Sequence, residues 1–249
     1  MAILRSDNLC KSYGGVQALG GVTLERSSPD IVALIGPNGA GKTTLLNVIT
    51  GFLAADAGHC FLDGYETTHL RPHQIARLGI ARTFQDLRLL QQVSVLDNVL
   101  LARPRQRGER FWSALVGWGV VADEKCQRKA SLSLLEFVGL ENKSHTLAGE
   151  LSYGEQKLLS LACCVATEAG VLLLDEPIAG VHPQRAEQIL GLLRSLRGAG
   201  KLIIFIEHDL TFVREIADHV LVMDGGQLIA QGLPTEVLAR PEIVEAYIA

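Results

Sequence analysis

The fold of this chain is decided by the stretch Gly36-Pro37-Asn38-Gly39-Ala40-Gly41-Lys42-Thr43. It fits the pattern G-x-x-x-x-G-K-[ST], in which glycines let the backbone curl so that successive N–H groups converge on phosphate oxygens. The apolar run 31–35 precedes it directly, and a helical pattern over residues 43–51 follows. Because the motif needs a strand before it and a helix after it, this context predicts a phosphate-binding loop rather than an ordinary glycine-rich turn.

Two side chains at the end of this loop have specific predicted roles. Lys42 is placed to reach the β- and γ-phosphates of a nucleotide, and the Thr43 hydroxyl is placed to ligate Mg²⁺. The N-terminus of the helix that follows adds a partial positive charge.

Short apolar runs recur along the chain and alternate with helical patterns. The runs cover residues 31–35, 171–174, 202–206 and 220–223 and are rich in Val, Ile and Leu, which is typical of buried parallel strands. Helical patterns follow the first three runs at 43–51, 184–197 and 210–217, and Gly198 is the expected C-cap of the second. This alternation predicts an α/β sheet covered by helices.

The middle of the chain, residues 87–164, shows helical patterns with few strand signals. Ser94, followed three residues later by Asp97, resembles a capping box that opens a helix through Ala102, and residues 123–138 carry Leu and Val at helical spacing. We interpret 87–164 as a helical subdomain inserted into an α/β core. A single domain would then consist of the core in 1–86 and 165–232, the helical insertion, and a helical tail in 233–249.

Residues 103–121 combine four arginines with the apolar run FWSALVGWGVV. The run is far shorter than the roughly 18 apolar residues that a membrane span requires. The favoured interpretation is that Phe111, Trp112 and Trp118 pack inside the helical subdomain and the arginines are solvated. The alternative is that these aromatics contact a partner protein or the bilayer surface, with the arginines near anionic headgroups.

Composition and charge limit the class of protein. The chain has 249 residues, 48% of them hydrophobic, and a formal net charge of −4, so there is no basic excess of the kind that nucleic-acid binding requires. The start lacks the apolar region of a signal peptide, and no run approaches a membrane span. The odd set of cysteines has no CxxC pair, so we expect reduced cytosolic thiols; they are Cys10, Cys60, Cys126, Cys163 and Cys164.

Two further motifs carry candidate chemistry. The apolar run 171–174 ends in Asp175 and Glu176, and because side chains alternate along a strand, Asp175 can face a metal while Glu176 faces an attacking water. Residues 151–156, LSYGEQ, open a predicted helix over 157–167, where Ser152 and Gly154 suit an anion at the helix start. Taken alone, the acidic pair fits a turn or N-cap, and Ser152 fits a simple helix cap.

The ordered set of motifs resembles the nucleotide-binding subunits of ABC transporters over nearly the whole chain. The set comprises residues 36–43, Gln85 in Arg-Thr-Phe-Gln, LSYGEQ, LLLDEP at 172–177, and Ile206-Glu207-His208-Asp209. More narrowly, several segments are similar to the ATPases of branched-chain amino acid importers. They are Thr50-Gly51-Phe52, residues 80–85, the SYGEQ variant, Ala179-Gly180-Val181-His182-Pro183 and the tail 241–247.

The resemblance implies a fold and a set of site residues. The fold is α/β, with a P-loop NTPase (RecA-like) core, an antiparallel β subdomain and an inserted helical subdomain. Catalytic roles fall on Glu176 as general base, His208 at the γ-phosphate, and Gln85 near the attacking water. ATP binding falls on Tyr13 (stacking on adenine), Gly36, Pro37, Asn38, Gly39, Ala40, Gly41, Lys42, Thr43, Thr44, Ser152 and Gly154, and Mg²⁺ on Thr43, Gln85 and Asp175.

The resemblance also implies partners. Two ATP molecules would be sandwiched in a dimer with a second ABC ATPase, identical or related, so that Ser152 and Gly154 act on the partner's nucleotide. The chain would lie at the cytoplasmic face of the membrane on permease subunits served by a solute-binding protein. Tyr153 and Glu155 replace the common Gly and Gln of LSGGQ, and His182 replaces an aspartate, so coupling between the two sites can differ from the general pattern.

The resulting hypothesis is an ATP-hydrolysing importer subunit for branched-chain or other hydrophobic amino acids or a similar small solute. An ABC exporter, for example of lipid, stays open, because the substrate is read by other proteins. A soluble ABC-type ATPase in DNA repair or translation fits less well, because such relatives carry a long coiled coil or a second ATPase domain. A phosphate-loop kinase or GTPase leaves LSYGEQ unexplained, and no N/T-K-x-D segment is present.

Overall fold

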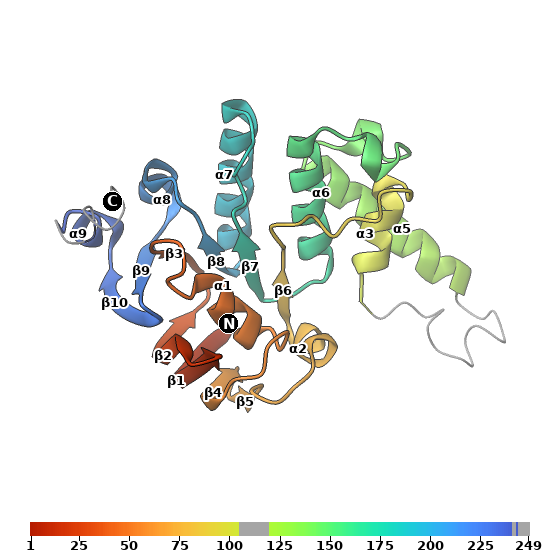
Figure 1. The fold of residues 1–249 in the computed structure, drawn as a ribbon. Coiled ribbons are helices and arrows are strands. Elements are labelled where there is room, and N and C mark those ends of the chain that lie inside the picture. Colours follow the sequence, from red (N-terminus) through yellow and green to blue (C-terminus); the bar gives the residue numbers. More distant parts are fainter. Residues whose placement is uncertain (105–119, 241–242, 244–249) are drawn as a thin grey trace. The chain divides into compact units, whose positions relative to one another are not determined.

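The computed structural model describes residues 1–104, 120–240 and 243, and it divides into two units (Figure 1). The first unit comprises Met1–Arg82, Gly170–Ala179 and Leu193–Ala249, and the second comprises Thr83–Ala169 and Gly180–Leu192. The second unit therefore contains the segment 87–164 that the sequence assigned to a helical insertion. It also contains residues 180–192, which the sequence placed in the α/β core.

The larger sheet lies in the first unit. Its strand order is β10 (Gln227–Gly232), β9 (His219–Asp224), β3 (Asp30–Ile35), β8 (Leu202–Ile206), β7 (Val171–Asp175) and β6 (Ile80–Arg82). The strands from β9 to β6 are parallel, and β10 pairs antiparallel with β9. Strands β3, β7 and β8 are buried at every position, as expected for parallel strands covered on both faces. The strands predicted from the apolar runs are confirmed.

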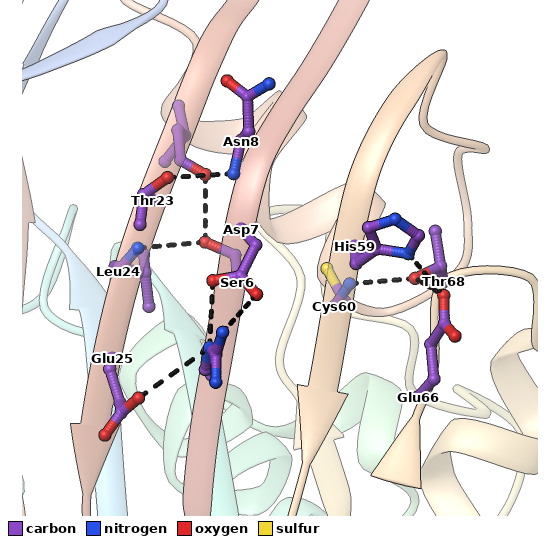
Figure 2. A network of polar contacts seen from close by, with 12 residues as sticks. Ser6, Asp7, Asn8, Thr23, Leu24, Glu25, His59, Cys60, Glu66 and Thr68 are labelled. Atoms are coloured by element: carbon purple, nitrogen blue, oxygen red, sulfur yellow. Dashed lines mark hydrogen bonds and ion pairs between the residues drawn. The ribbon is translucent and has the colours of Figure 1, made fainter. Parts of the chain in front are cut away.

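The smaller sheet, in the same unit, is antiparallel. It has the order β2 (Val16–Ser27), β1 (Ile3–Tyr13), β4 (Ala57–Leu62) and β5 (Tyr65–Glu66). The register between β1 and β2 shifts between Ser6 and Leu9. Side chains bridge the irregularity: the Leu24 N–H donates to Ser6 Oγ at 3.2 Å and the Asn8 N–H to Thr23 Oγ1 at 2.9 Å (Figure 2). Backbone groups that leave the ladder thus keep hydrogen-bond partners.

Helix α1 (Lys42–Ile49) connects the two sheets through one hydrophobic core. Leu45, Leu46 and Ile49 belong to a buried cluster that also contains Leu9 of the small sheet and Leu34 of the large sheet. Because the helix that follows the glycine-rich loop packs on both layers, the position of the loop is fixed by the core.

The second unit is mainly helical. It contains α3 (Val95–Ala102), α5 (Val120–Phe137), α6 (Tyr153–Ala166) and the 3-10 turns η2 (Glu141–Lys143) and η3 (Ala148–Glu150). Ser94 caps α3 as predicted, with its Oγ accepting from the Asp97 N–H at 3.1 Å. Helix α6 begins at Tyr153, four residues before the start that the sequence suggested, because Ser152 is its N-cap.

The remaining helices are α2 (Pro72–Leu78), α7 (Pro183–Gly198), α8 (Leu210–Ile216) and α9 (Pro234–Val237). Helix α7 begins in the second unit and belongs to the first from Leu193 onward. The expectation that Gly198 is its C-cap was wrong. Gly198 is still helical, and the left-handed conformation is at Gly200, with φ +86°.

Some of the sequence predictions concern residues that the structure does not describe. Phe111, Trp112, Trp118 and most of the segment 103–121 lie outside the described residues, as do residues 241–242 and 244–249 of the predicted tail. None of the helices in the described ranges is long and apolar enough to cross a membrane. All five cysteines are free thiols in the structure.

Candidate nucleotide-binding site

The carboxyl ends of four neighbouring parallel strands bring the predicted motifs of the first unit to one edge of the sheet. In the register, Leu34 of β3 and Asp175 of β7 both pair with Ile206 of β8, and β6 lies beside β7. The glycine-rich loop follows β3, the acidic pair ends β7, His208 follows β8, and Arg82 ends β6. Ligand sites of open α/β sheets lie at this edge.

The glycines of the loop are required by its packing. Gly36 has φ +150°, and a Cβ there would lie 2.0 Å from the Met223 carbonyl oxygen. At Gly41, with φ +96°, a Cβ would lie 2.3 Å from the Ala18 carbonyl oxygen. Gly39 has φ +83°, and a Cβ there would meet nothing within 4 Å. The loop is therefore packed tightly against β9 and β2 at its ends and is open at Gly39, as a phosphate cradle must be.

Lys42 is the first residue of α1, and its ammonium group lies against the loop. Its Nζ donates to the carbonyl oxygens of Gly36 at 2.6 Å and Pro37 at 2.9 Å. Burial lowers the pKa of Lys42, while the carboxylates of Glu176 and Asp175 oppose that shift. An ammonium group has three donors, so these two hydrogen bonds leave capacity for a phosphate oxygen.

Asp175 is held by a buried ion pair with Arg82. Arg82 Nη2 lies 3.1 Å from Asp175 Oδ2, and the two side chains are 4% and 6% exposed. Arg82 Nη1 also donates to Asn47 Oδ1 of α1 at 2.7 Å. One guanidinium therefore connects β6, β7 and the helix of the phosphate loop, and it fixes the carboxylate that was predicted to face the metal.

Glu176 and His208 lie close together. Glu176 has φ +47°, a left-handed conformation that costs a residue other than glycine about 1–2 kcal/mol. Its N–H donates to the Ile206 carbonyl oxygen at 3.0 Å, and its Oε1 lies 3.5 Å from His208 Nε2. Strain of this kind is concentrated at functional sites, where the surrounding structure holds a side chain in a required direction.

Two further candidates of the first unit, Tyr13 and Thr43, are accessible. Tyr13 ends β1 and is 49% exposed, and the ammonium of Lys11 lies 6.0 Å from the centre of its ring. Thr43 is exposed on the first turn of α1, directly after Lys42. An exposed ring can stack on a base and an exposed hydroxyl can ligate Mg²⁺, so the roles of Tyr13 with adenine and of Thr43 with Mg²⁺ stay predictions.

Mg²⁺ is compatible with this donor set. Thr43 and Asp175 offer oxygen ligands, and proteins bind Mg²⁺ through one or two carboxylates together with substrate phosphates. Within the part of the chain that the structure describes, no group of three or more His, Cys, Asp or Glu side chains could hold a metal ion by itself. The oxygen donors of Thr43 and Asp175 fit an ion that is also bound by substrate phosphates.

Gln85 belongs to the second unit, in an exposed loop before α3. Within this loop the guanidinium of Arg88 lies 3.8 Å from the centre of the Phe84 ring. The Asn98 side chain fastens the end of the loop by accepting from the Leu90 N–H at 2.9 Å and donating to the Leu90 carbonyl oxygen at 3.1 Å. The loop that carries Gln85 is thus anchored to the helical unit.

Ser152 and Gly154 also belong to the second unit, at the start of α6. Ser152 forms a capping box with Glu155: the Glu155 N–H donates to Ser152 Oγ at 3.4 Å, and the Ser152 N–H to Glu155 Oε2 at 3.1 Å. The helix-capping alternative weighed for Ser152 therefore describes what it does in the chain. Besides the hydrogen bonds from Lys143, those from both the backbone and the side chain of Ser152 help to lower the pKa of the Glu155 carboxyl.

The two departures from LSGGQ have structural partners in the same unit. Lys143 Nζ donates to both carboxylate oxygens of Glu155 at 2.8 Å and lowers the pKa of that carboxyl. The ring of Tyr153 lies against Gly180, where a Cβ would be 3.1 Å from Tyr153 Cε1. The start of α6 is thus packed on the segment that leads into α7.

Sequence reasoning missed the residues that hold the predicted site residues in place. Arg82 stood inside the quoted Arg-Thr-Phe-Gln motif without a role, and Asn47 was not singled out. A signal was present for Arg82, because a charged residue that ends an apolar strand beside the acidic strand is placed to pair with it. For Asn47, only the three-dimensional packing of α1 reveals the contact.

Comparison with known proteins agrees with this geometry. The family model for ABC transporters matches residues 19–179, and the chain belongs to that family. It is an ATPase of the P-loop type, and the fold class and family predicted from the sequence are confirmed.

The particular relatives are ATPases of amino acid transport. The chain is 39% identical to the probable branched-chain amino acid transport ATP-binding protein LivG of Archaeoglobus fulgidus, over 100% of this chain and 96% of the relative. It is 36% identical to the high-affinity branched-chain amino acid transport ATP-binding protein BraF of Pseudomonas aeruginosa, over 99% and 97%.

Solved structures give the same result. An ATP-binding cassette from an ABC transporter, solved without nucleotide, matches with a TM-score of 0.86 at 37% identity, covering 100% of both chains. A cassette solved in its ADP conformation matches with the same TM-score and identity, covering 100% of this chain and 99% of the other.

Proposed function

We propose that this chain is the ATP-hydrolysing subunit of an ABC importer for branched-chain or other hydrophobic amino acids. The observation that carries the proposal is the shared edge of the sheet, where Lys42, Asp175 and the pair Glu176 and His208 meet beside an open glycine-rich loop. The similarity to branched-chain amino acid transport ATPases over the full chain supports the substrate class.

In this proposal the loop amides and Lys42 bind the phosphates, and Tyr13 stacks on the adenine. Mg²⁺, held by Thr43 and Asp175, would neutralise phosphate charge. Glu176 takes a proton from the attacking water, and His208, whose ring nitrogen lies 3.5 Å from that carboxylate, orients the γ-phosphate and the water. The strained backbone at Glu176 aims the carboxylate before the substrate arrives.

Ser152 and Gly154 act on the nucleotide of a second ATPase subunit, which is a copy of this chain or a related one. Each γ-phosphate is then a ligand shared across the dimer, and its loss on hydrolysis weakens the closed state. The mechanical output moves permease subunits, so the chain works at the cytoplasmic face of the membrane. A solute-binding protein delivers the amino acid to the permease.

The partners test the proposal. Tagged Glu176→Gln protein is isolated from native membranes in mild detergent with ATP and Mg²⁺, and Lys42→Ala, which cannot hold the phosphates, is the matched control. We expect hydrophobic permeases and an ATPase partner to be recovered, with the ATPase partner depleted in the control. Uptake of labelled leucine by cells should then fall with either variant.

Other outcomes contradict the proposal. Recovery of only ribosomal or DNA-repair proteins would end the transport role while leaving ATP hydrolysis intact. Recovery of a permease whose loss makes lipid accumulate inside the cell, while amino acid uptake is unchanged, would identify an exporter.

A further inference from the structure

Glu207 is a buried carboxylate that contacts both segments that carry the proposed catalytic side chains. It follows β8 directly, and the residue is 3% exposed. Its Oε1 accepts from the Ile178 N–H at 2.9 Å, and its Oε2 accepts from the His208 N–H at 3.3 Å. The two oxygens thus bind two different segments, one after β7 and one after β8.

These contacts belong to a set of interactions that links the segment after β7 to the segment after β8. The Glu176 N–H donates to the Ile206 carbonyl oxygen, and two residues later Ile178 donates to Glu207. Glu207 in turn accepts from the His208 N–H, and the His208 ring lies 3.5 Å from Glu176 Oε1. The turn that holds Glu176 at φ +47° is therefore tied at both ends to the segment that carries His208.

The chemistry of Glu207 suits such a tie. A carboxylate is an acceptor at both oxygens, and hydrogen bonds from backbone amides to a charged acceptor are about twice as strong as neutral ones. A serine or threonine at this position has one oxygen and a shorter side chain, so it cannot bridge two amides in the same way. A buried charge is also costly unless its acceptor sites are used, so a position without such a task would favour an uncharged residue.

We propose that Glu207 is a positioning residue for ATP hydrolysis: it fixes the distance and direction between Glu176 and His208. The inference rests on the roles proposed above for those two residues. The hydrogen bonds that this carboxylate accepts from the Ile178 and His208 amides tie the turn of Glu176 to the segment of His208, so we expect its loss to affect turnover more than nucleotide affinity. Loss of either hydrogen bond frees the turn to relax the left-handed conformation at Glu176.

The test separates turnover from binding. Glu207→Gln and Glu207→Ala are compared with wild-type protein for kcat, KM and the Kd for ATP. We expect kcat to fall on the order of 10- to 100-fold for Ala, because small misplacements of catalytic groups cost this much. Gln keeps one acceptor oxygen and should be intermediate, and the Kd for ATP should change less than about twofold in both.

A matched control removes general destabilisation from the comparison. Asp30 is also a buried carboxylate of this unit, 7% exposed, but it starts β3 at the opposite end of the strand and lies 3.0 Å from His219 Nδ1. Asp30→Asn should lower the Tm without lowering kcat per folded molecule. If Glu207→Ala does not fold, the same comparison is made between Glu207→Gln and Asp30→Asn, in each of which an amide replaces a carboxylate of the same shape.

The outcomes distinguish this inference from the proposed function. Wild-type kcat in Glu207→Ala and Glu207→Gln, or an equal loss in Asp30→Asn, overturns the positioning role. A parallel rise in the Kd for ATP overturns it as well, because it would mean that Glu207 supports binding. If Glu176→Gln itself keeps wild-type turnover, the proposed role of Glu176 fails, and the inference fails with it.

Discussion

Replacing Arg82 by alanine is the sharpest test of how the site is held. Arg82 and Asp175 form an ion pair whose side chains are 4% and 6% exposed, and the same guanidinium donates to Asn47. Arg82→Ala leaves the Asp175 carboxylate buried without that partner. Removing one member of a buried pair costs about 3–5 kcal/mol.

The structure places this case at the lower end of that range. The ammonium of Lys42 is also close enough to Asp175 for their charges to interact, so part of the carboxylate's charge stays compensated. We therefore expect the free energy of unfolding to fall by about 3 kcal/mol, which for 150–250 residues corresponds to a Tm lower by about 6–12 °C. Arg82→Lys keeps a positive charge but lacks the planar guanidinium fork that reaches Asp175 and Asn47 together, so the loss of stability should be smaller than in Arg82→Ala.

The assay is thermal unfolding followed by circular dichroism, with Arg5→Ala as the control. Arg5 also pairs with an aspartate, Asp7, but their side chains are 51% and 32% exposed, and exposed pairs contribute little. Arg5→Ala should leave the Tm within experimental error. Equal shifts for the two alanine variants would refute the argument that burial gives the Arg82 pair its importance.

Two further predictions concern the start of α6. Gly180→Ala should lower the free energy of unfolding by about 1–2 kcal/mol, because Gly180 has φ +73° and its added Cβ would lie 3.1 Å from Tyr153. The control is Gly191→Ala within α7, where an added Cβ would meet nothing within 4 Å, and it should raise the free energy of unfolding by about 0.5–1 kcal/mol. Urea unfolding measures both variants, and equal changes in stability would contradict the argument that Gly180 packs against Tyr153. Lys143 lowers the pKa of Glu155 from its ordinary value of 4.5, so the ionised carboxylate stabilises the fold above that pH, and the stabilisation is lost as the pH falls through the lowered pKa. Glu155→Gln should therefore be less stable than wild type at neutral pH, and the difference should shrink as the pH falls through the lowered pKa; a difference that does not depend on pH would contradict this reasoning.

The fold could be predicted from the sequence where one signal had one structural cause. The apolar runs that became β3, β7 and β8 are buried at every position, so their composition alone identified them. The long strands β1 and β2 were not located in the same way. Their burial is mixed, and the register shift between them is bridged by side chains such as Ser6 and Thr23 that resemble surface residues in the sequence.

The site divides in a similar way. Groups that we propose to act on a nucleotide lie in motifs with fixed spacing, so Lys42 and Asp175 could be singled out from the sequence. The residues that hold these groups in place come from strands that are neighbours in the sheet but distant in the sequence. Arg82, for example, pairs with Asp175, which lies 93 positions further along the chain. The helix boundary at Tyr153 was missed for a local reason: Ser152 was weighed as a helix cap, but Glu155, which completes the capping box with it, was not recognised as its partner.

The central claim is that this chain hydrolyses ATP with Glu176 as general base on phosphates held by Lys42. The most direct measurement compares ATP binding and steady-state hydrolysis in wild-type, Glu176→Gln and Lys42→Ala proteins. We predict that Glu176→Gln binds ATP with wild-type affinity and turns over about 10²- to 10⁴-fold more slowly, while Lys42→Ala loses affinity. Wild-type hydrolysis by Glu176→Gln, or wild-type affinity in Lys42→Ala, would contradict it.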